Sequence, residues 1–163
     1  MAITYEPLTT TTLTSAAAEV VFGSIPTTYT DLVLIVNGGF TQVGQSFYFR
    51  FNSDSSSIYS YTYMAGSGSA TSSNKSSGPG IAAYNVNGQS DTLLKSQATL
   101  QLQNYSNTTT FKTCLIRGNT DLTTQATVGL YRSTSAITAL TILATNGNLQ
   151  TGSTFTLYGI LKA

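Results

Sequence analysis

The chain has 163 residues, a formal net charge of +1 and only 8% charged residues, against about 25% in ordinary globular domains. It has no histidine and a single cysteine, Cys114, which excludes Ser-His-Asp and Cys-His catalysis, an intrachain disulfide and a thiolate metal site. Apolar residues still make up 40% of the chain, so the composition predicts a folded domain and not a disordered one.

The low charge predicts a surface of hydroxyl, amide and tyrosine side chains. A near-zero net charge protects a free monomer poorly against association, so we expect a protein packed against copies of itself or a larger assembly. The length suits one domain. Abundant Thr, Val, Ile, Tyr and Phe favour strands over helices, and Cys114, in an apolar run, is expected to be a small buried side chain.

The N-terminal segment, residues 1–15, has Tyr5 and Leu8 as isolated apolar anchors near a threonine run. It is either an arm that lies on a neighbouring molecule or an edge strand of the same domain. Residues 16–163 are predicted to form a single domain.

The strands predicted in this domain are apolar throughout or alternate with period two, and turn residues separate most of them. The clearest are 31–37, 47–52, 58–64, 98–105, 111–117, 126–131, 136–145 and 152–163. The segments 98–105 and 111–117 are expected to form an antiparallel hairpin. The closing segment is apolar on both faces, which predicts that it lies inside a sheet, beside residues 31–37 or another central strand.

Two segments are candidates for binding. Tyr59, Tyr61 and Tyr63 share one face of their strand, and an exposed aromatic row can stack on sugars or anchor a protein partner; alternatively, the rings pack against the second layer of the domain. Residues 65–80 are rich in Gly and Ser with one charge, Lys75, and are predicted to form a long projecting loop.

The predicted fold class is therefore all-β: an antiparallel β-sandwich, jelly-roll-like, with eight to ten strands and no substantial helix. An immunoglobulin-like sandwich is the alternative, and the absence of its typical Cys and Trp pattern argues against it.

The chain has few residues that suggest a catalytic or ligand-binding site. The carboxylates are scattered singly, and Asp54 with Asp91 is the one pair considered as a glycosidase dyad and set aside. We predict a protein that is not an enzyme, with no catalytic residue, cofactor or metal. Seven dispersed basic residues argue against nucleic acid, and no apolar run reaches the roughly 18 residues of a membrane helix.

Four stretches together resemble a family of small virion structural proteins from tailed bacteriophages and cyanophages: 22–32, 105–110, 130–138 and 152–160. The resemblance extends from about residue 19 to the end of the chain. It implies membership of a virion as a capsid decoration, tail or fibre component, after synthesis in the cytoplasm of the bacterial host.

The role expected first is a capsid decoration or cement protein that holds the capsid surface through the arm, the loop and tyrosine-rich polar contacts. The alternative is a tail fibre or receptor-binding tip that recognises a host glycan. The expected partners are copies of the chain, as a trimer, and the major capsid protein. The candidate partner-binding residues are Tyr5, Leu8, Tyr59, Tyr61, Tyr63 and Lys75.

Overall fold

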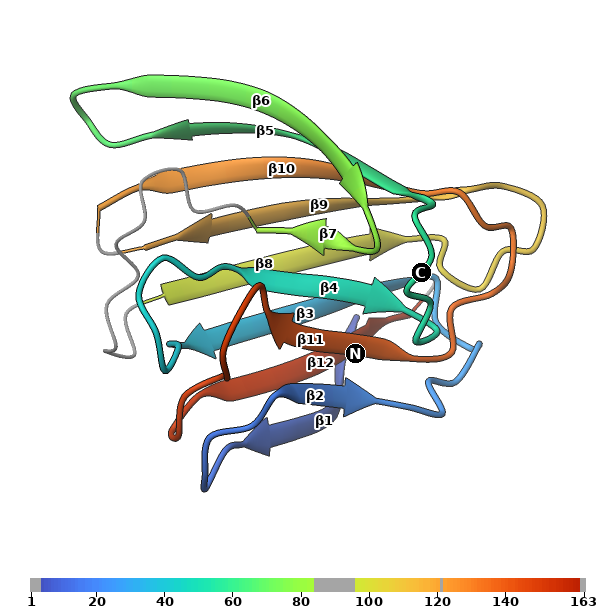
Figure 1. The fold of residues 1–163 in the computed structure, drawn as a ribbon. Coiled ribbons are helices and arrows are strands. Elements are labelled where there is room, and N and C mark those ends of the chain that lie inside the picture. The colour runs from blue at the N-terminus through green and yellow to red at the C-terminus, as the bar shows by residue number, and fades with distance from the viewer. Residues whose placement is uncertain (1–3, 84–95, 121, 162–163) are drawn as a thin grey trace.

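The computed structural model describes residues 4–83, 96–120 and 122–161, which form strands, bridges and turns and no helix. The strands make two antiparallel sheets, one of eight strands and one of four, packed as two layers (Figure 1). The prediction of an all-β antiparallel sandwich is confirmed.

The larger sheet has the order β1-β12-β3-β8-β9-β10-β5-β6. In that order its strands are β1 (Tyr5–Thr12), β12 (Thr154–Ile160), β3 (Asp31–Gly38), β8 (Ser96–Gln103), β9 (Lys112–Asn119), β10 (Thr124–Tyr131), β5 (Tyr59–Gly66) and β6 (Thr71–Gly78). The smaller sheet has the order β2-β11-β4-β7. Its strands are β2 (Glu19–Phe22), β11 (Leu140–Ala144), β4 (Phe47–Phe51) and β7 (Ile81–Ala82).

Eight of these strands have the connectivity of a jelly roll. The first strand pairs with the last, β1 with β12, and the nested pairs β2 with β11, β3 with β8 and β4 with β7 follow. Two insertions supply the other four strands. The β5–β6 hairpin interrupts the connection from β4 to β7, and β9–β10 interrupts the connection from β8 to β11.

The core lies between the two sheets, and β4 illustrates how the sequence builds it. Phe47, Phe49 and Phe51 are buried, whereas the alternate residues Tyr48 and Arg50 are half-buried on the other face. This is the alternation expected of a strand with one face on the core. Cys114 is also buried, as predicted for a small apolar side chain.

The closing strand lies inside the larger sheet, as its two apolar faces predicted. Strand β12 pairs with β1 on one side and with β3 on the other. A Cβ atom added at Gly159 would lie 2.5 Å from the Tyr29 ring, so only glycine leaves room for this ring over the strand. The Tyr29 hydroxyl also donates a hydrogen bond to Glu6 Oε2 (3.0 Å), which ties the segment before β3 to β1.

Gly159→Ala is expected to lower the free energy of unfolding by about 1–3 kcal/mol, because the Tyr29 ring must leave its place on β12. Chemical denaturation followed by fluorescence measures the loss. Gly23→Ala is the matched control, since a Cβ atom there meets nothing within 4 Å. Equal stability of the two variants would contradict this account of the packing.

Residues 65–80 are not the projecting loop that their composition predicted. Strand β6 occupies half of the segment and pairs with β5 along its whole length. A turn joins them, in which the Ser67 N–H donates to the Ala70 carbonyl (3.0 Å) and Gly68 takes the positive φ of 86°. The prediction of a loop was wrong because β6 is exposed. Backbone pairing with β5 holds an exposed edge strand in the sheet without any apolar side chain.

Of the two alternatives for the N-terminal segment, the structure shows the edge strand: β1 pairs with β12 at one end of the larger sheet. The register shifts between Pro7 and Thr9, so Leu8 is the residue of a β-bulge, and it packs against the core. Residues 1–3 lie outside the described residues, as does Asp91 of the carboxylate pair.

Candidate functional site

The two insertions meet and create a surface that a plain jelly roll lacks. Strand β10 pairs with β5 over eight residue pairs, from Thr124 opposite Gly66 to Tyr131 opposite Tyr59. Strands β9, β10, β5 and β6 thereby continue the larger sheet past β8 (Figure 1). We call these four strands the sheet extension, and the face turned away from the smaller sheet the outer face.

The tyrosine row of β5 lies on the inner face of the extension. Tyr59, Tyr61 and Tyr63 are buried and belong to the core. The rings therefore pack against the second layer of the domain and do not form an exposed binding stripe. The other side of the strand forms the surface: Ser60, Thr62 and Met64 alternate with the tyrosines on the outer face.

The start of β5 is anchored by an aromatic cluster. The Tyr59 and Tyr131 rings stack with centroids 4.7 Å apart, and the Tyr59 hydroxyl donates to the Phe51 carbonyl (3.2 Å). The Tyr131 hydroxyl donates to Asp54 Oδ2 (3.1 Å). Hydrogen bonds donated by the Ser56 hydroxyl and the Ser56 N–H hold the pKa of Asp54 below its usual value, and the bond from Tyr131 lowers it by a smaller amount.

A lowered pKa in the folded state means that the Asp54 carboxylate stabilises the fold above its unfolded pKa. The contribution is lost as the pH falls through the folded pKa. We therefore expect the free energy of unfolding to fall below about pH 4, and Asp54→Asn to remove that part of the pH dependence. Urea denaturation at pH 3 to 7 measures it; an unchanged pH profile in the variant would show that Asp54 does not contribute.

Three apolar side chains stand exposed on the outer face of the extension. Met64 is 66%, Val128 57% and Leu115 37% exposed. They lie close together because β10 runs between β9 and β5. On β10, Val128 is opposite Leu115 of β9, and Ala126, two residues before Val128, is opposite Met64 of β5. We call Met64, Leu115, Ala126 and Val128 the apolar patch.

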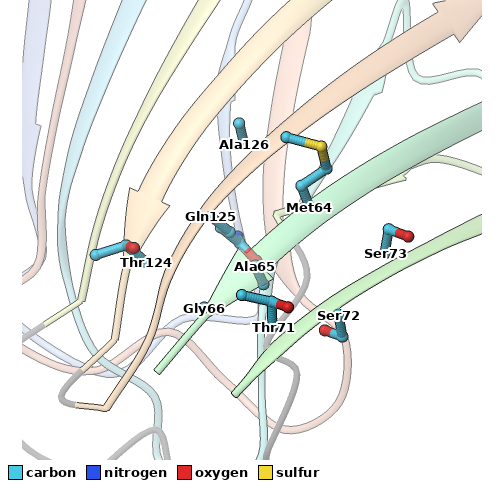
Figure 2. A pocket seen from close by; sticks show the side chains of 9 residues that line it. All are labelled: Met64, Ala65, Gly66, Thr71, Ser72, Ser73, Thr124, Gln125 and Ala126. Atoms are coloured by element: carbon cyan, nitrogen blue, oxygen red, sulfur yellow. The ribbon is translucent and has the colours of Figure 1, made fainter. Parts of the chain in front are cut away.

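Two hollows flank this patch along β5. Figure 2 shows the first, of about 610 Å³, which lies between the ends of β5, β6 and β10. The Met64 side chain stands over it, and the residues on the β6 side are Thr71, Ser72 and Ser73. Apart from Met64 and Gln125 this hollow is lined by small residues, and it carries no charged group among its lining residues.

The second hollow, of about 730 Å³, crosses all four strands of the extension. Val128 and Leu130 supply its apolar lining, Ser60 and Thr62 its hydroxyls, and Lys75 and Arg132 its charges; no carboxylate lines it. Arg132 is held in place because its guanidinium donates to Ser60 Oγ (2.9 Å) and to the Ile58 carbonyl (3.3 Å). The hollow therefore favours an anionic group over a cationic one.

The structure does not bring the predicted binding residues together. Tyr5 and Leu8 lie on β1, at one edge of the larger sheet, and Lys75 lies on β6, at the opposite edge. Tyr5 is 53% exposed and Leu8 is partly buried against the core. Of the predicted set, Lys75 and Tyr61 line the second hollow of the outer face.

Comparisons with known proteins leave the chain without a family. No family model matches it, and no curated protein matches it significantly. Among solved structures, a protein of unknown function from Shewanella oneidensis MR-1 is 8% identical and aligns over 98% of this chain and 77% of its own, with a TM-score of 0.28. A similarity this weak identifies neither a relative nor a function.

Within the described ranges, no three His, Cys, Asp or Glu side chains cluster as metal ligands would. The same ranges contain no helix with the length and apolar character needed to cross a bilayer. The outer face of the extension and the edge of β6 are two surfaces of these ranges that a partner could contact.

Proposed function

We propose that the protein is a structural component of a bacteriophage virion, a capsid decoration protein that binds the capsid surface through the outer face of its sheet extension. The observation that carries this proposal is the apolar patch. Met64 and Val128 are more than half exposed on the sheet, and exposed apolar side chains gathered within a polar surround are typical of protein–protein contact surfaces.

Three further features support the same role. The resemblance to small phage structural proteins covers most of the chain, and the low charge of the chain suits a surface that is covered in an assembly. In addition, the two insertions continue one sheet of a jelly roll and so enlarge a single face. A binding role accounts for these features without any catalytic group.

The binding surface in this proposal differs from the one expected from sequence. The tyrosines are buried and residues 71–78 form a strand, so neither a tyrosine stripe nor a long loop reaches the capsid. The contact instead combines the apolar patch with the hydroxyl groups around it. Many copies with weak individual contacts occupy a capsid stably, because its repeated sites multiply small affinities.

Val128→Lys is expected to weaken binding to purified capsids by about tenfold or more, because the contact would then bury an unpaired charge. Val21→Lys is the matched control: Val21 is also an exposed strand valine, at 48% against 57% for Val128, but lies on the smaller sheet. Co-sedimentation with capsids that lack the protein measures occupancy. Equal occupancy of both variants would refute a contact through the outer face.

A tail fibre or receptor-binding tip is the second proposal, favoured by the second hollow. Its hydroxyls together with Lys75 and Arg132 suit an acidic glycan, whose hydroxyl and carboxylate or sulfate groups match them.

Lys75→Gln removes one charge from this hollow and should reduce adsorption of the protein to host cells or to an immobilised acidic polysaccharide several-fold. Arg117→Gln should leave adsorption unchanged, since Arg117 is a cation of β9 that does not line the hollow. Glycan binding that responds equally to both changes would indicate general charge attraction and would argue against a receptor site.

A further inference from the structure

The structure leaves one long, regular strand edge open. Strand β6 ends the larger sheet, its eight residues are exposed or nearly so, and its register with β5 runs without a shift. Its outer edge has no strand partner among the described residues. Such an edge carries a row of unpaired N–H and C=O groups and is a template for another strand.

The other sheet edges are protected. Strand β1 carries Pro7, which has no N–H to donate, and a bulge at Leu8, two devices that prevent edge pairing. In the smaller sheet the edge strands β2 and β7 have four and two residues, and short edges pair poorly. The contrast singles out β6 as the edge at which the sheet can continue.

The turn of the hairpin determines which backbone groups of β6 point outward. The Ser67 N–H donates to the Ala70 carbonyl (3.0 Å), so this facing pair is hydrogen-bonded, and bonded pairs alternate along an antiparallel ladder. Every second residue of β6 therefore turns its N–H and C=O away from β5: Thr71, Ser73, Lys75 and Ser77. The Lys75 N–H accordingly bonds to the Asn74 side chain (2.8 Å).

We propose that β6 pairs antiparallel with β6 of a second copy of this chain, on a two-fold axis at Asn74, so that two eight-stranded sheets become one continuous sheet. In this register Thr71 is opposite Ser77 of the second copy and Ser73 is opposite the second copy's Lys75. All the outward backbone groups find partners, and the Lys75 N–H exchanges its bond to Asn74 for one across the axis.

Charge and side-chain size select a second copy as the partner. Lys75 is the only charged residue of β6, and a two-fold axis at Lys75 itself would place like charges opposite each other, which is unfavourable. An axis at Asn74 places each lysine against a serine. The remaining side chains are Ser, Thr and Asn, which fit on both faces of a continued sheet, and a two-fold pair closes without further growth.

This inference does not depend on the proposed virion role, and it replaces the trimer expected from sequence by a dimer. The first test is Ser73→Pro in the purified full-length chain. Proline removes an N–H that points away from β5, which an edge strand tolerates, so the fold should be kept and the dimer lost. Sedimentation equilibrium measures the association, and thermal unfolding by circular dichroism checks the fold.

A pair of charge variants at the same position tests the register itself. Ser73→Glu places a carboxylate opposite the second copy's Lys75 at two symmetric sites and should tighten dimerisation by about 2- to 30-fold. Ser73→Lys places like charges there and should weaken it by a similar factor. Ser73→Ala keeps the N–H and the neutral charge and is the control.

The outcomes separate the alternatives. A monomer at all concentrations, or a dimer that persists in Ser73→Pro, would overturn the proposal. A dimer that is lost in Ser73→Pro but responds equally to the glutamate and lysine variants would overturn the register at Asn74. Loss of the dimer with capsid binding retained would leave the proposed decoration role intact, so the two proposals fail separately.

Discussion

The ladder between β10 and β5 is the interaction on which the proposed contact surface of this molecule depends. These strands come from different insertions, and their eight residue pairs join them into one sheet. Without the ladder the β5–β6 hairpin would have no place in the larger sheet, and the apolar patch and the second hollow would not form. Backbone hydrogen bonds hold the ladder, and on the inner face the Tyr59–Tyr131 stack closes its end.

The jelly roll and the extension serve different purposes. In the jelly roll, the nested pairs bring the two ends of the described chain together, with β12 held between β1 and β3. Its inner faces are filled by large apolar side chains such as Phe49, Leu34 and Phe155. The extension uses the same inward alternation but carries on its outer side serine, threonine and a few exposed apolar residues. The proposed contact surface and the core contacts that stabilise the fold thus lie on opposite faces of one sheet.

Much of this architecture could be predicted from the sequence, because burial on one face leaves a period-two pattern. The alternation of residues 47–51, the hairpin of β8 and β9, and the position of the closing strand next to β3 were all expected and are confirmed. Strand β6 was missed because an exposed edge strand leaves no apolar periodicity. The face of β5 was ambiguous because the pattern shows which side chains share a face and not which face is covered. Thr62, Met64 and Val128 could have been suggested as outward residues by their alternation with buried neighbours. Their proximity, however, depends on a pairing of distant insertions that no local pattern specifies.

The central claim, that the outer face of the extension is the contact surface in the assembled particle, can be tested directly by oxidative footprinting of the protein on capsids and free in solution. Met64 is a sensitive probe because its thioether is exposed on that face and oxidises readily. Oxidation of Met64 is expected to fall strongly on the particle, while modification of Tyr5, on the opposite edge of the sheet, stays unchanged. Equal oxidation of Met64 in the two states would contradict the claim.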